Sequence, residues 1–314
     1  MDPAKAMEEG KKANREMIEL FRSLPDDCYS IELMEKIVSM PMWCVDNNED
    51  NLDVGVALYE AYQSENLLDD PAHFEKIIAL FRKTLSIYTY GPKMDRMKLA
   101  AYEFFKRRSE EDPEKYFDSY MGMAVDTMWL RNEGIDEHEE WNRILKEMRE
   151  KYEEKPEMYQ YWLGYALVKN ANFDYESESV EDKDNSLEKL RESLELAIDY
   201  CKTNGVSMGA LFDPIHINYL IIERLTELGR KEELIQHYKK VIELIDKANA
   251  DTVRSDGRPR YSDMYAKAMM DLSKALEESS PKESEMYLQK AKKYIQENDL
   301  EYLFMPNDYD DWGN

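Results

Sequence analysis

The side chains that most often perform catalysis or hold metals are few and scattered in this chain of 314 residues. No two histidines have the spacing of a zinc or metalloprotease motif such as HExxH, and no two cysteines form a CxxC pair. The sequence also contains no Walker loop, no GxGxxG turn and no GxSxG elbow. We therefore predict a protein that is not an enzyme and that needs no cofactor or metal.

Residues 46–57 (DNNEDNLDVGVA) superficially resemble a calcium-binding loop, because oxygen-bearing side chains occupy the first, third and fifth positions. A calcium loop also needs glycine at the sixth position for a sharp turn and a bidentate glutamate at the twelfth. Those positions hold Asn51 and Ala57. The segment is therefore predicted to be an acidic turn that caps a helix.

The charge balance restricts the class of partner. The chain has 42 Lys and Arg against 67 Asp and Glu, so the net charge is 42 − 67 = −25. This excess works against binding to a nucleic-acid backbone or to an anionic membrane, both of which attract basic surfaces. We expect a protein or peptide partner that is more often basic than acidic, and neither nucleic acid nor membrane. The alternative is that the charge only keeps a helical surface soluble.

Three features bear on the compartment. The cysteines are odd in number, the N-terminal segment MDPAKAMEEGKKANREM has no apolar core, and no apolar run approaches the length of about 20 residues that spans a bilayer. We expect a cytoplasmic protein.

Apolar residues recur at helical spacing along most of the sequence, and the alternation typical of strands is absent. The spacing predicts an all-α fold with about thirteen helices joined by short loops, arranged as stacked helical hairpins. Asp or Ser before proline is a frequent helix start. Helix starts are predicted at Asp70–Pro71, Asp112–Pro113, Lys155–Pro156, Asp213–Pro214 and Ser280–Pro281, and stops or turns at Pro41 and Gly91–Pro92.

Two connections are predicted to be longer than the others. Residues 173–185 (FDYESESVEDKDN) contain six carboxylates and one lysine, and residues 249–262 (NADTVRSDGRPRYS) form a basic loop. Loops of this length are often functional or tolerated insertions, and both alternatives stand. The basic residues of the second loop are Arg254, Arg258 and Arg260.

Helix pairs in the second half share a recurring pattern of apolar and small residues. One copy is carried by Asn218, Ile221, Ile222, Leu225, Gly229, Leu234, Tyr238 and Val241, a second by Met269, Leu272, Ser273, Leu276, Tyr287, Ala291 and Tyr294, and a third by Leu163, Gly164, Leu167, Leu190, Leu194 and Ala197. The pattern resembles the tetratricopeptide repeat, a helix–turn–helix unit of 34 residues. The position of the family's tryptophan holds other residues, namely Gln160, Asn218 and Met269.

The resemblance implies a right-handed α-α superhelix made of stacked hairpins. Residues 1–314 would form a single array, with irregular hairpins over 1–155, repeats of this type over 156–297, and a capping or free tail over 298–314. An irregular all-α protein whose core residues follow the same spacing is the alternative.

The resemblance also implies a concave binding surface built by the first helix of each hairpin. Such a surface would bind a peptide, and tyrosine suits this role because it offers a large contact area with a polar tip. Ordinary packing between helices is the alternative for these side chains. The implied binding residues are Tyr161, Tyr165, Lys169, His216, Tyr219, Glu223, Met270 and Lys274.

Three functions follow from these features. The first is a peptide-binding scaffold, and the second is a regulatory protein that senses a ligand or peptide on the same fold. An enzyme or an acidic mimic of nucleic acid is the third.

Overall fold

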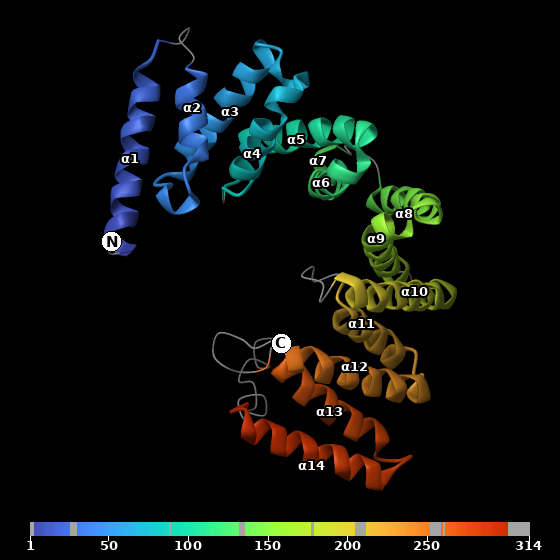
Figure 1. The fold of residues 1–314 in the computed structure, drawn as a ribbon. Coiled ribbons are helices and arrows are strands. Elements are labelled where there is room, and N and C mark those ends of the chain that lie inside the picture. Colours follow the sequence, from blue (N-terminus) through green and yellow to red (C-terminus); the bar gives the residue numbers. More distant parts are fainter. Residues whose placement is uncertain are drawn as a thin grey trace, which may run out of the picture. The chain divides into compact units, whose positions relative to one another are not determined.

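The computed structural model describes residues 3–25, 30–87, 89–131, 136–176, 179–204, 212–251, 259 and 261–300. These residues contain fourteen α-helices, of which thirteen have seven residues or more, and no strand (Figure 1). The all-α fold and the predicted number of helices are therefore confirmed.

The chain divides into two compact units, residues 1–137 and 138–314. A single continuous array over the whole chain stays a prediction. The helices of the first unit are α1 (Pro3–Ser23), α2 (Ile31–Ser39), α3 (Asn48–Ser64), α4 (Phe74–Leu85), α5 (Pro92–Glu111), α6 (Pro113–Asp126) and α7 (Met128–Arg131). Its three short 3-10 turns are η1 (Met42–Cys44), η2 (Leu67–Asp69) and η3 (Pro71–His73).

The second unit consists of helices that pack against their neighbours in the sequence. Consecutive helices pack as α9 with α10, α11 with α12, and α13 with α14, and α12 also packs against α13 as extensively as against α11. Each pair is a helical hairpin, as Figure 1 shows for α13 and α14. The bounds are α8 (Glu137–Glu154), α9 (Pro156–Glu176), α10 (Val180–Asn204), α11 (Pro214–Glu227), α12 (Lys231–Asp251), α13 (Ser262–Leu276) and α14 (Pro281–Glu297).

Helices two apart in the sequence are also in contact, so the hairpins stack. In the second unit, ion pairs join the even-numbered helices; they are Arg149–Glu192, Arg191–Glu233 and Lys239–Glu283. Among the odd-numbered helices, the Tyr219 hydroxyl donates a hydrogen bond to the Met264 carbonyl at 2.8 Å. The second unit therefore has two layers, with α8, α10, α12 and α14 in one and α9, α11 and α13 in the other.

The first unit repeats this arrangement with its own ion pairs. Glu35 of α2 pairs with Lys76 of α4 at 2.9 Å, and Glu75 of α4 pairs with Lys115 of α6, also at 2.9 Å. The buried apolar side chains of α1 to α6 form one continuous core. Because a single hairpin would leave one apolar stripe in water, stacking of neighbours stabilises each of them.

The core of the second unit requires a close approach between α9 and the segment before α11. Phe212 is fully buried, and its ring lies so near Gly164 that a Cβ atom at position 164 would be 1.8 Å from the Phe212 Cε2 atom. Ser193 of α10 donates a hydrogen bond to the Gly164 carbonyl at 2.9 Å. Glycine is therefore the residue that allows these three segments to pack.

Three of the predicted helix starts are capped as expected. Asp70, Asp112 and Asp213 each accept a hydrogen bond from a backbone amide of the following turn, at 3.0, 3.2 and 2.8 Å respectively. At Gly91–Pro92, where a stop or turn is predicted, the chain bends at Gly91, and α5 begins at Pro92. Gly91 has φ 126°, a backbone conformation that glycine adopts readily, and proline suits the first turn of a helix.

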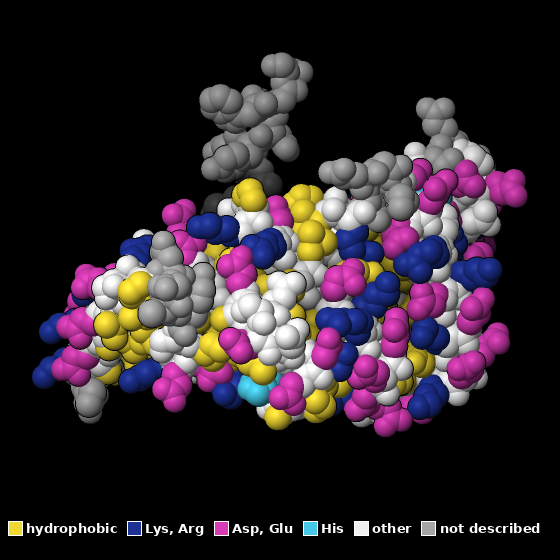
Figure 2. All heavy atoms as spheres, turned by 90° about the horizontal axis from the view of Figure 1, so that it is seen from above, with side chains coloured by type: hydrophobic (Ala, Val, Ile, Leu, Met, Phe, Trp, Pro, Cys, Tyr) yellow, Lys and Arg dark blue, Asp and Glu magenta, His cyan; other side chains and the backbone are white. Residues whose placement is uncertain are grey.

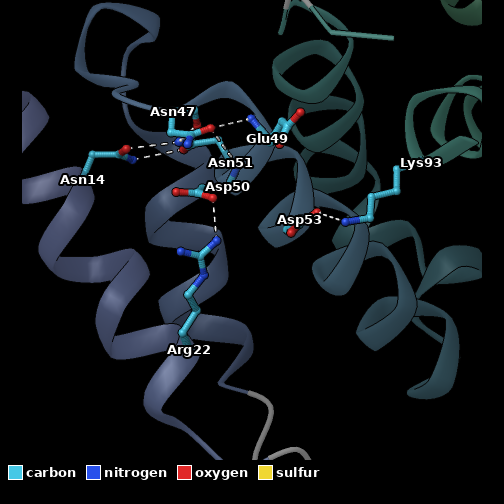
Figure 3. A network of polar contacts seen from close by, with 8 residues as sticks. All are labelled: Asn14, Arg22, Asn47, Glu49, Asp50, Asn51, Asp53 and Lys93. Atoms are coloured by element: carbon cyan, nitrogen blue, oxygen red, sulfur yellow. Dashed lines mark hydrogen bonds and ion pairs between the residues drawn. The ribbon is translucent and has the colours of Figure 1, made fainter. Parts of the chain in front are cut away.

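The segment that superficially resembles a calcium loop is a helix start. Asn47 caps α3 by accepting hydrogen bonds from the backbone amides of Glu49 and Asp50, at 2.9 and 3.3 Å, so the predicted capping turn is confirmed (Figure 3). Asn51, one turn further on, exchanges side-chain hydrogen bonds of 3.0 and 3.1 Å with Asn14 of α1. Both amides are buried, so this pair fixes α1 against α3.

The long acidic connection predicted over 173–185 is also wrong. α9 continues to Glu176 and α10 begins at Val180. The early carboxylates Glu181 and Asp182 lie in the first turn of α10, where negative charge is stabilised by the helix dipole. The connection predicted over 249–262 agrees more closely with the helix bounds, because α12 ends at Asp251 and α13 begins at Ser262. Arg254, Arg258 and Arg260 lie outside the described residues.

Candidate binding groove

Three of the eight predicted binding residues come together in one groove between α11 and α13. Tyr219 contributes from α11, and Met270 and Lys274 contribute from α13. The groove has a volume of about 520 Å³, which is within the range of ligand pockets. Its remaining lining residues are Asp263, Met264, Lys267 and Asp271.

Tyr219 forms the α11 side of the groove and is held in place by α13. Its hydroxyl donates to the Met264 carbonyl at 2.8 Å, so its hydrogen is already used within the protein. Burial raises the pKa of Tyr219, and the negative charge of Asp271 raises it further. The side chain therefore stays neutral and offers an aromatic face to whatever enters the groove.

Asp271 is the unusual residue of the groove. It is half-buried, and within the described part of the chain it forms no hydrogen bond and no ion pair. Burial raises the pKa of Asp271, and the positive charges of Lys267 and Lys274 only partly oppose this effect. Across from it, burial and the charge of Asp271 raise the pKa of Tyr238 on α12 to about 12. The carboxylate is thus in a place that disfavours its charge.

Lys267, Asp271 and Lys274 form a row on one face of α13. They follow each other at i, i+4 and i+7, the spacing that stacks side chains along a helix. Both lysines are exposed, and within the described residues neither forms an ion pair. We call these three residues the charge row.

Some charged side chains elsewhere in the second unit form ion pairs between helices. Lys239 reaches Glu283 at 2.6 Å, and Arg149 makes two hydrogen bonds to Glu192, of 2.8 and 2.6 Å. Figure 2 shows Lys and Arg side chains interspersed with Asp and Glu side chains over the face in view, an arrangement in which opposite charges can meet. Within the described residues the two lysines of the charge row, like Lys282 and Lys292 on α14, are exposed and form no ion pair.

The predicted residues of α9 do not line this groove. Tyr161 lies with its ring centroid 6.4 Å from that of Tyr165 and 5.3 Å from that of Phe212. The Lys169 ammonium is 5.9 Å from the centre of the Tyr165 ring and 5.8 Å from that of Trp141, within the range of cation–π attraction. Burial raises the pKa of Tyr165. These side chains pack with each other and with their neighbours in the core.

The two remaining predicted residues of α11 also lie apart from the groove lining. Glu223 is exposed, and its carboxylate lies 2.6 Å from the guanidinium of Arg224. Arg224 is buried, with its guanidinium carbon 3.6 Å from the centre of the Tyr175 ring. Glu223 thus balances a buried cation. His216 is half-buried.

Sequence reasoning missed Asp263, Met264, Lys267 and Asp271. Two of them could have been found, because stepping back from Lys274 by three and seven residues on the same helical face gives Asp271 and Lys267. The contact between Tyr219 and the Met264 carbonyl depends on how α11 and α13 pack, which sequence spacing does not define.

Two further properties concern the described residues only. No group of three or more His, Cys, Asp or Glu side chains among them is arranged to hold a metal ion. None of the helices described is both long enough and apolar enough to cross a membrane.

Comparison with known proteins adds no family to this description. No protein-family model matches the sequence, and no curated protein shows a significant match.

Proposed function

We propose that this protein is a non-enzymatic scaffold that binds a peptide segment of another protein in the groove between α11 and α13. On this proposal the three hairpins of residues 156–297 are repeats of the tetratricopeptide type and the protein acts in the cytoplasm. The observation that carries the proposal is the half-buried Asp271, which has no partner within the described residues and which faces the groove.

The groove has the chemistry of a peptide site. Tyr219 supplies a broad aromatic surface whose position is fixed by its hydrogen bond to Met264. Met270 supplies a flexible, polarisable side chain that adapts to different contacts. Together these residues favour apolar contact with a segment of chain, while Asp271 supplies one charged contact.

Asp271 is costly for the folded protein, and this cost supports a binding role. Burial penalises its charged form, and no hydrogen bond or ion pair within the described residues compensates for the penalty. Perturbed titratable groups that face a groove are common at functional sites. A cationic group of a partner would supply the missing contact, and the net charge of −25 would attract it from a distance.

A direct binding measurement tests the proposal. Fluorescence anisotropy is recorded for labelled peptides of about ten residues that contain a tyrosine, a leucine and a central lysine or arginine. We expect binding to the wild-type protein and an approximately tenfold to hundredfold weaker complex with Asp271→Asn, since losing a charge-assisted hydrogen bond costs about 1.5–3 kcal/mol.

The matched control is Asp199→Asn. Asp199 is an exposed residue of α10 that pairs with Lys202 at 2.7 Å, outside the groove, so the substitution makes the same change in net charge. Equal weakening by both variants would mean that only the overall charge matters. Absence of binding by every peptide would contradict the proposal.

A further inference from the structure

The charge row determines which order of charges a bound segment should have. We propose that the groove selects a segment in which one lysine or arginine stands between two acidic residues, in the order acid–x–base–x–acid. This inference rests on the proposed function and names the chemistry of the partner.

The dimensions of the groove favour an extended segment. Its α13 side runs from Asp263 to Lys274, which at a rise of 1.5 Å per residue is about 16 Å. An extended chain covers that distance in about five residues, because each adds about 3.3 Å. An α-helix has a diameter of about 10–12 Å and needs about eleven residues to cover the same distance, so the extended chain places fewer residues in the groove.

The spacing of the charges fits the same segment. Alternate residues of an extended chain point to one side and lie about 6.6 Å apart. Along α13 the step from Lys267 to Asp271 is about 6 Å and the step from Asp271 to Lys274 is about 4.5 Å. The long stems of the two exposed lysines can make up the difference. Because the pattern reads the same in both directions, it does not depend on the direction of the bound chain.

Repulsion excludes the alternatives. A segment with a row of basic residues would bring cations against Lys267 and Lys274, and a segment with a row of acids would bring an anion against Asp271. Like charges placed opposite each other are a usual means of rejecting wrong partners. The lysines are available for this role because neither forms an ion pair within the described residues.

The test uses four labelled peptides that share one apolar framework and differ only at three alternate positions. Their charged residues are E-x-K-x-E, the reordered K-x-E-x-E of equal net charge, K-x-K-x-K and E-x-E-x-E. We expect E-x-K-x-E to bind the full-length protein at least tenfold more tightly than the other three at moderate ionic strength. High salt should reduce this difference, since exposed charges are screened.

Variants of the protein test the individual contacts. Lys274→Gln should weaken the binding of E-x-K-x-E about threefold to tenfold. The binding of K-x-K-x-K should be unchanged or tighter. Circular dichroism should show unchanged helicity, because Lys274 is exposed. The combined variant Lys267→Glu, Asp271→Lys, Lys274→Glu should prefer a fifth peptide of the same framework, K-x-E-x-K, over E-x-K-x-E. If that variant does not fold, the effect of Lys274→Gln on the binding of E-x-K-x-E and K-x-K-x-K still tests the charge order.

Three outcomes would overturn the inference. If K-x-K-x-K binds best and Asp271→Asn abolishes its binding, the proposed function stands and the charge order is wrong. If no peptide binds, both fail. If the protein dimerises in sedimentation experiments and Asp271→Asn abolishes the dimer, the occupant is a second copy of the chain rather than a partner of the proposed kind.

Discussion

The ring of Phe212 occupies the space that a side chain at Gly164 would need. A Cβ atom there would lie 1.8 Å from one ring carbon and 2.6 Å from two others, well inside normal contact distance. Phe212 is fully buried, so the ring has no solvent-exposed position into which it could move without disturbing the core.

Gly164→Ala should therefore destabilise the protein although alanine is the better helix former. Overpacking a core costs about 1–3 kcal/mol, which exceeds the gain of about 1 kcal/mol in helix propensity. Urea denaturation should show a lower midpoint with an unchanged slope. Adding Phe212→Leu to the variant should restore part of the loss.

The control for this substitution is Gly122→Ala in α6. An added Cβ at Gly122 would meet no atom within 4 Å, so only helix propensity changes and the midpoint should rise. A fall in stability at both sites would contradict the role assigned to Phe212.

Asp271→Asn should stabilise the folded protein at neutral pH. Burial raises the pKa of Asp271 in the folded state, so the native protein binds a proton more readily than the unfolded chain. Stability should therefore fall as the pH rises from the unfolded value of 3.8 through the folded value. The wild-type midpoint in urea should approach that of the variant below about pH 4. A variant that is less stable than wild type at pH 7 would show that Asp271 supports the fold.

His237 should make the protein less stable in mild acid. Burial, followed by the positive charges of Lys240 and Arg191, lowers the pKa of His237 to about 4. The unfolded chain therefore binds the proton first, and stability should be lost as the pH falls from about 6.5 to about 4, by about 2–3 kcal/mol. The Nδ1 atom of His237 lies 2.9 Å from the Asn218 Oδ1 atom, within hydrogen-bond distance. Protonation of the ring alone would not break this hydrogen bond, because a protonated Nδ1 can donate to the amide oxygen.

Urea denaturation across this pH range measures the effect. His237→Gln should lose less stability than the wild-type protein between pH 6.5 and 4, because glutamine does not titrate. If the variant keeps the wild-type pH dependence, another group is responsible.

The Asn14–Asn51 pair should be strongly coupled in a double-mutant cycle. Asn14→Leu alone leaves a buried amide of Asn51 with fewer partners, at a cost of about 1–3 kcal/mol. Replacing both by leucine removes the unsatisfied group, so the double variant should lose less than the sum of the two single variants. Purely additive losses would show that the amides contribute independently.

Local features of this fold could be predicted from the sequence because they depend on neighbouring residues. Asp70, Asp112 and Asp213 start helices through their own side chains, and the turn at Asn47 needs only the two amides that follow it. The carboxylates at the start of α10 instead suggest a loop, because acidic residues are common both in loops and in the first turn of a helix. The sequence alone does not distinguish these two uses.

The groove was predictable only in part for a different reason. Tyr219, Met270 and Lys274 follow from a helical pattern, whereas their meeting depends on the packing of α11 against α13. Tyr161 and Tyr165 follow the same pattern, yet they pack in an aromatic cluster, Tyr161 against Phe212 and Tyr165 against Trp141. Side chains at equivalent helical positions thus have different neighbours.

The ion pairs between even-numbered helices give each unit a polarity. In the first unit the earlier helix carries the acid and the later one the cation, and in the second unit the order is reversed. These pairs are Glu35–Lys76 and Glu75–Lys115 in the first, and Arg149–Glu192, Arg191–Glu233 and Lys239–Glu283 in the second. A hairpin transplanted from one unit to the other would therefore meet like charges at its new border. Hairpins from the two units are therefore not interchangeable. A hairpin added to either unit would need the same order of acidic and basic helices as that unit.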